Sequence, residues 1–184
     1  MNLPNKLTIL RVCMIPFFVL FMLVPLLGGT IDKWIAVIIF IAASLTDMAD
    51  GKIARKYHLV TNFGKFMDPL ADKLLVSSAL ICLCGTQIPT WIVIVIISRE
   101  FIISAFRLIA SDRGIVIAAG WWGKLKTAVQ MVMIPVLILH FEQFGWYLVL
   151  EQSLIYVSLV LTIVSLCDYL WKNKSVLSEE NTNK

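Results

Sequence analysis

Long apolar runs separated by short polar segments set the organisation of this chain. A helix needs about 20 residues to cross a bilayer, and six runs approach that length. The predicted spans are residues 9–27, 34–48, 69–84, 89–109, 128–141 and 154–170. The third and fifth runs are short, so their helices are expected to continue for a turn or more into the cytoplasm.

Hydrophobic residues make up 59% of the 184 residues, and charged residues only 15%. This composition is typical of a multi-span membrane protein and excludes a soluble domain. We expect an all-α integral membrane protein with six transmembrane helices. Residues 1–174 are predicted to form a single domain and residues 175–184 a polar tail. No small-residue cleavage pattern follows the first run, which is therefore expected to be a retained span.

Basic residues gather in alternate polar segments, whereas the segments between them hold only Lys33. By the positive-inside rule, both termini and the two charged loops are predicted to be cytoplasmic. The basic residues are Lys6 and Arg11, then Lys52, Arg55, Lys56, Lys65 and Lys73, then Arg107, Arg113, Lys124 and Lys126, and finally Lys172, Lys174 and Lys184.

Four aspartates lie beside the second and third spans, at Asp47, Asp50, Asp68 and Asp72. Carboxylates next to a membrane span are costly and usually mark a functional site. The first two are three residues apart and the last two are four apart, so each pair shares one helix face. Facing pairs would repel one another unless cations neutralised them. Oxygen ligands favour Mg²⁺ or Mn²⁺, so the spacing predicts a metal site at the cytoplasmic surface of the membrane.

Small residues accompany these acids, at Gly51, Ala54 and Gly64, and Arg55 adds a fork of donors suited to phosphate. Small side chains let a substrate or another helix approach the backbone closely. The combination indicates a metal-bound diphosphate with a flanking arginine. The alternative is helix packing together with a positive-inside arginine.

This constellation resembles the signature of the CDP-alcohol phosphotransferase family. The signature reads Asp-x2-Asp-Gly-x2-Ala-Arg, eight residues, then Gly-x3-Asp-x3-Asp, and every position is filled between Asp47 and Asp72. The resemblance implies a six-helix fold and two metal ions, Mg²⁺ or Mn²⁺, held by the four aspartates. It also implies that Asp72 is the general base for the acceptor alcohol.

The same resemblance implies a pocket for the CDP group. Its lining would include Gly51, Ala54, Arg55 and Gly64. Asn5, Thr8 and Arg11, at helical spacing near the start of the chain, are expected to close the nucleotide side. The alternative for this segment is an amphipathic anchor at the membrane interface.

A second set of basic residues indicates where an acceptor phosphate would bind. Glu100, Ser104 and Arg107 form a polar stripe at helical spacing in the fourth span. The predicted anion pocket consists of Arg107, Arg113, Lys124 and Lys126. It favours a phosphorylated alcohol, although positive-inside topology alone also accounts for basic loops. Arg99 and Glu100, both inside an apolar run, are interpreted as a buried structural pair.

Several further segments are similar to those of bacterial members that join CDP-diacylglycerol to glycerol 3-phosphate. These are residues 5–11, 68–73, 98–101 and 123–127. The resemblance implies an enzyme of anionic phospholipid synthesis in a bacterial plasma membrane, which yields phosphatidylglycerol phosphate and CMP. It further implies a homodimer among membrane lipids, and no nucleic acid is expected as a partner.

The same residues are compatible with other functions. The same fold and two-metal chemistry serve other acceptors, such as inositol phosphate, serine or phosphatidylglycerol. An intramembrane prenyltransferase also uses aspartates, magnesium and a diphosphate, but it needs more spans than this length allows. A cation or proton transporter that uses the carboxylates as relay sites is the non-enzymatic alternative.

Overall fold

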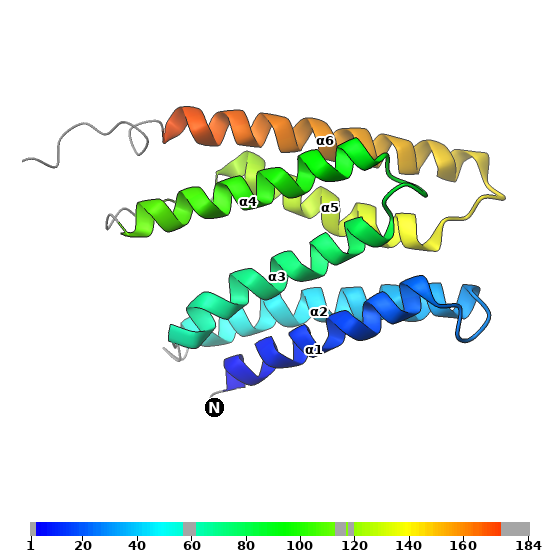
Figure 1. Ribbon diagram of the computed structural model, residues 1–184, viewed down its shortest axis with the longest axis horizontal. Helices are drawn as coiled ribbons and strands as arrows, with labels where there is room; N and C mark the ends of the chain where they lie inside the picture. Colours follow the sequence, from blue (N-terminus) through cyan, green and yellow to red (C-terminus); the bar gives the residue numbers. More distant parts are fainter. Residues whose placement is uncertain (1–2, 57–61, 113–116, 118–119, 174–184) are drawn as a thin grey trace, which may run out of the picture. The chain divides into compact units, whose positions relative to one another are not determined.

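The computed structural model describes residues 3–56, 62–112, 117 and 120–173. Over these residues the chain forms six helices, and its only β-type pairing is an isolated bridge between Cys84 and Ile88. The helices are α1 (Leu3–Leu23), α2 (Thr30–Lys56), α3 (Asn62–Cys82), α4 (Thr90–Asp112), α5 (Trp121–Leu139) and α6 (Gly145–Lys172) (Figure 1). The predicted all-α class is confirmed, and the predicted polar tail lies outside the described residues.

Each predicted span coincides with one helix, but the ends differ. Helices α2, α3, α5 and α6 extend well beyond their apolar runs because helical hydrogen bonding continues into the flanking polar segments. Helix α1 instead ends at Leu23, before the predicted end at Leu27. Pro25, which lacks a backbone N–H, follows this end within two residues.

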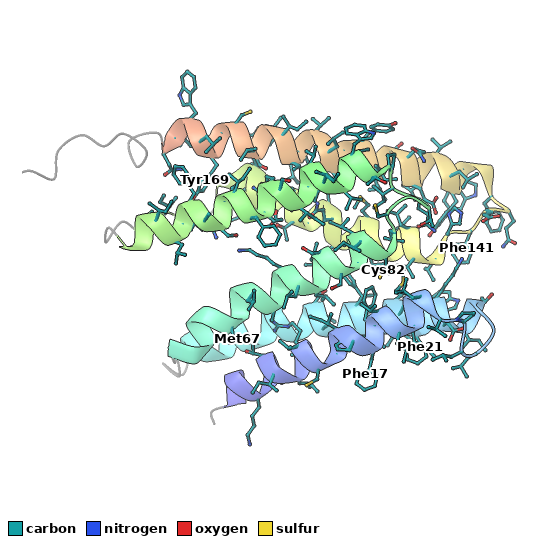
Figure 2. All side chains as sticks on the ribbon, in the orientation of Figure 1. Phe17, Phe21, Met67, Cys82, Phe141 and Tyr169 are labelled. Carbon is teal, nitrogen blue, oxygen red and sulfur yellow. The ribbon has the colours of Figure 1, made fainter. Side chains whose placement is uncertain are left out.

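Three segments of the described chain are long and apolar enough to cross a membrane. They are Lys6–Leu23 of α1, Trp121–Leu139 of α5 and Gly145–Lys172 of α6. Large apolar side chains are also exposed on the helices, as Figure 2 shows for Phe17, which points away from α1. Such an exposed apolar surface is typical of a protein that is covered by lipid rather than water.

The chain forms two units, and one boundary between them falls within α5. The first unit comprises residues 1–88 and 134–141. In this unit α1 packs against both α2 and α3, and α2 also contacts α3. Alanines at the centre, including Ala36, Ala43 and Ala71, are fully buried and allow the helix backbones to approach closely. Phe18 and Phe40 fill the remaining space between α1 and α2, with ring centroids 6.0 Å apart.

The second unit comprises residues 89–133 and 142–184. Here α4 packs against α6 through Ile103, Phe106, Ala110 and Tyr169. The rings of Phe106 and Tyr169 meet edge to face, with centroids 5.8 Å apart, and Tyr169 is labelled on α6 in Figure 2. This geometry matches the quadrupoles of the two rings and holds the C-terminal half of α6 against α4.

The connection between α1 and α2 is organised by one buried carboxylate, that of Asp32. Gly28 and Gly29 adopt positive φ angles of 104° and 75°, which glycine tolerates without strain. Asp32 is 2% exposed and accepts hydrogen bonds from the backbone N–H groups of Leu27 at 3.1 Å and Gly29 at 2.8 Å. It also lies in the first turn of α2, where the helix dipole favours a negative charge.

Replacing this carboxylate should destabilise the first unit. In Asp32→Ala the N–H groups of Leu27 and Gly29 lose their acceptor, which should lower the free energy of unfolding by about 1–2 kcal/mol. Unfolding of purified protein in mixed detergent micelles measures the change, with exposed Lys33→Ala as the neighbouring control. Equal stabilities of the two variants would show that the Asp32 interactions are not needed.

Candidate active site

The four aspartates lie on two adjacent helices of the first unit. Asp47 and Asp50 are in α2, and Asp68 and Asp72 are in α3, so both pairs have the helical spacing that the sequence predicts. Residues three or four apart in a helix share a face. The side chains of all four lie outside the described part of the structure, and their predicted roles as metal ligands and base therefore stay predictions.

The ends of the helices that carry these acids lie together. Only residues 57–61 separate the end of α2 from the start of α3, and both ends are on the same side of the first unit in Figure 1. The two helices contact each other, and both pack on α1. The fold thus brings two acid-bearing helix segments to one end of one unit, as a shared metal site requires.

The residues predicted to surround the CDP group belong to the same three helices. Gly51, Ala54 and Arg55 continue α2 beyond Asp50, and Gly64 lies one turn before Asp68 in α3. Asn5 belongs to the first turn of α1. The side chains of Asn5 and Arg55 lie outside the described part.

Thr8 and Arg11 are described, and both are completely buried on α1. The residues between them, Ile9 and Leu10, are exposed. A helix lying at the membrane interface presents its polar residues to water and its apolar residues to lipid. Here the polar residues turn inward, toward the interior formed with α2 and α3. The burial therefore favours an interior role for Thr8 and Arg11 over the alternative of an interfacial anchor.

The predicted acceptor pocket is distributed over α4 and α5 of the second unit. Arg107 on α4 and Lys124 on α5 are exposed, whereas Lys126 is only 2% exposed. Arg113 lies outside the described residues. Lys126 therefore has an environment unlike that of Arg107 and Lys124, although the sequence predicts all of them in one pocket.

A buried polar network surrounds Lys126. Its Nζ forms an ion pair with Oε1 of Glu100, and the same oxygen accepts a hydrogen bond from Nη1 of Arg99 at 2.9 Å. Arg99 also donates from Nη2 to Oγ of Ser165 at 3.0 Å. The expected Arg99–Glu100 pair is confirmed. Sequence spacing could not reveal the other two partners, since Lys126 lies 26 residues from Glu100 and Ser165 lies 66 residues from Arg99.

Gly123 allows this network to form so close to the backbone of α5. A β-carbon built on it would lie 3.4 Å from Nη2 of Arg99, so the guanidinium occupies the space beside the glycine. Gly123 and Lys126 are three residues apart and share a face of α5. The polar side chains of Arg99 and Glu100 on α4 therefore lie against that face of α5.

No group of three or more metal-ligating side chains occurs among the side chains that the structure describes. The predicted ligands are not among those side chains. The donor set nevertheless suits a hard divalent cation, because carboxylate oxygens are the ligands that Mg²⁺ and Mn²⁺ prefer.

Known proteins resemble this chain over almost its whole length. The sequence model of a family described as CDP-alcohol phosphatidyltransferase matches residues 1–164. A Bacillus subtilis protein named CDP-diacylglycerol–glycerol-3-phosphate 3-phosphatidyltransferase is 46% identical, over 98% of this chain and 99% of its own. A Haemophilus influenzae protein of the same name is 39% identical, over 96% and 95%. A Mycobacterium tuberculosis protein named probable phosphatidylglycerophosphate synthase is 40% identical, over 91% and 79%.

Proposed function

Because the chain belongs to the CDP-alcohol phosphatidyltransferase family, we propose that it transfers the phosphatidyl group of CDP-diacylglycerol to glycerol 3-phosphate. The products are phosphatidylglycerol phosphate and CMP. The observation that carries this proposal is the 46% identity, over nearly the full length of both chains, to the B. subtilis protein whose name states this reaction. The complete aspartate signature on α2 and α3 supports the same chemistry.

The four aspartates would hold two Mg²⁺ or Mn²⁺ ions. When bound, the ions would supply positive charge that neutralises the diphosphate and the charge developing on the leaving group. Asp72 accepts the proton from the acceptor hydroxyl as its oxygen attacks the phosphorus that bears diacylglycerol. The bond from this phosphorus to the oxygen of CMP breaks, and CMP leaves. Arg55, on the helix that bears Asp47 and Asp50, binds the nucleotide phosphates.

The acceptor side is assigned to Arg107, Arg113, Lys124 and Lys126. Cations bind a phosphate through charge-assisted hydrogen bonds, and a neutral alcohol such as serine would not need them. The names of the relatives favour glycerol 3-phosphate within the class of phosphorylated alcohols. Inositol phosphate and phosphatidylglycerol are the competing acceptors for the same two-metal chemistry.

We also propose that all six helices cross a bacterial plasma membrane and that both termini are cytoplasmic. Trp146 and Trp171 near the two ends of α6 are 66% and 78% exposed. They are separated by about 38 Å of helix, at about 1.5 Å per residue. A bilayer with its polar interfaces is about 40–45 Å thick, so both indoles would reach an interface, where tryptophan is enriched. The active site is then at the cytoplasmic surface. We further propose that the protein is a homodimer.

The proposed reaction predicts a specific pattern of CMP release. Purified protein in detergent micelles should release CMP from CDP-diacylglycerol when Mg²⁺ or Mn²⁺ and glycerol 3-phosphate are present, and EDTA should abolish the release. Serine, inositol phosphate and phosphatidylglycerol serve as competing acceptors. Faster release with one of them would reassign the acceptor. Metal-dependent ion flux in vesicles without any CMP release would support the transporter alternative.

The proposed base predicts a selective effect on turnover. Asp72→Asn removes the proton acceptor. General-base catalysis typically contributes about 10²–10⁴-fold, so kcat should fall by at least about 10²-fold. Binding of CDP-diacylglycerol should persist, because three aspartates and the CDP pocket remain. Asp168→Asn, the same chemical change in α6, should leave kcat within about twofold. Turnover of Asp72→Asn near the wild-type rate would assign the base elsewhere.

A further inference from the structure

We propose that Glu100 is a positioning residue for the phosphate of the acceptor, which it serves by fixing the ammonium group of Lys126. This inference rests on the proposed function and deepens it. From the sequence, Lys126 is expected in the phosphate pocket, whereas Glu100 is expected to pair with Arg99 and to share a polar stripe with Arg107. The structure adds the link between the two, because one carboxylate oxygen, Oε1 of Glu100, meets both cations.

Contact with this carboxylate helps to place Lys126. Lys126 is 2% exposed, and its flexible four-carbon stem allows many orientations unless a partner selects one. Glu100 on α4 supplies that partner from the helix that also carries Arg107. The ion pair therefore fixes the position of one proposed phosphate ligand on α5 relative to the helix that bears another.

Glu100 is itself held in place by the third helix of the unit. Arg99 donates to Glu100 on one side and to Ser165 of α6 on the other. Ser165 in turn donates from Oγ to the backbone carbonyl of Thr162 at 3.0 Å. The network thus runs from α6 through Arg99 and Glu100 to Lys126 on α5. Each side chain in this network is held by the one before it.

Stability alone is a poor reason for such an arrangement. Buried ion pairs cost desolvation energy, and apolar residues of similar size often stabilise a protein as well or better. The Nε of Arg99 is buried and has no hydrogen-bond acceptor within the described residues, so the network is not optimised for polar satisfaction either. A positively charged group held at a defined place is, in contrast, what recognition of a phosphate requires.

Glu100→Gln is the direct test, because it keeps the size of the side chain and removes its charge. The KM for glycerol 3-phosphate should rise about tenfold, the size expected when one charge-assisted contact is misplaced. The KM for CDP-diacylglycerol should change less than about twofold, since the CDP residues belong to the other unit. The matched control, Asp168→Asn, removes a carboxylate that pairs with Lys172 at 2.7 Å on α6 and should change neither KM.

A double variant separates positioning from general damage. If Glu100 acts through Lys126, then Glu100→Gln, Lys126→Met and the double variant should show similar KM values for glycerol 3-phosphate. The inference is overturned if the two single effects multiply in the double variant, or if Glu100→Gln leaves the acceptor KM unchanged.

Two further measurements keep these outcomes interpretable. If Glu100→Gln does not fold, Glu100→Asp replaces it. This shorter carboxylate should give a rise in acceptor KM without a change in the KM for CDP-diacylglycerol, and an unchanged acceptor KM overturns the inference. The wild-type reaction with glycerol 3-phosphate is measured first. Its absence refutes the proposed function, whereas an active wild type with an unaffected Glu100→Gln refutes the positioning role alone.

Discussion

A charge inside an apolar helix bundle must find a partner, and the polar architecture of this protein follows from that constraint. An isolated ion in a medium of low dielectric constant is very costly, whereas a paired or hydrogen-bonded one is tolerated. Asp32 meets the requirement with backbone N–H groups, and Glu100 meets it with Arg99 and Lys126. The same constraint is the reason for proposing divalent cations as partners of the four aspartates on α2 and α3.

The two units carry different sets of the proposed functional residues. Helices α2 and α3 of the first unit carry the acids, which suit metal ions and a diphosphate. Helices α4 and α5 of the second unit carry the basic residues assigned to the acceptor. Lys126 differs from the others because the fold has already paired it inside its own unit. In the proposed role of Lys126, its ammonium group would be oriented before the phosphate binds, which would reduce the cost of ordering it on binding.

Much of this fold was predictable because membrane spans leave a strong signal in the sequence. Six helices lie where six apolar runs predict them, and the aspartate pairs lie on helices at the expected spacing. The helix ends were less predictable. The length of an apolar run indicates which part of a helix suits lipid, but not how far the helical hydrogen bonding continues. The partner of Lys126 was not predictable at all, since it depends on how α5 packs against α4. The opposite environments of Lys124 and Lys126 have the same origin, because residues two apart in a helix face different directions.

If the aspartates of α2 and α3 hold a pair of divalent cations, as proposed, the purified protein should bind manganese. Metal analysis should find about two Mn²⁺ ions per chain, and electron paramagnetic resonance should give a spectrum of magnetically coupled ions, as expected for a two-metal site. Asp68→Asn removes one of the four proposed metal ligands, so it should abolish the magnetic coupling while the protein stays folded. Binding of fewer than one ion per chain, or an unchanged coupled spectrum in Asp68→Asn, would contradict the claim.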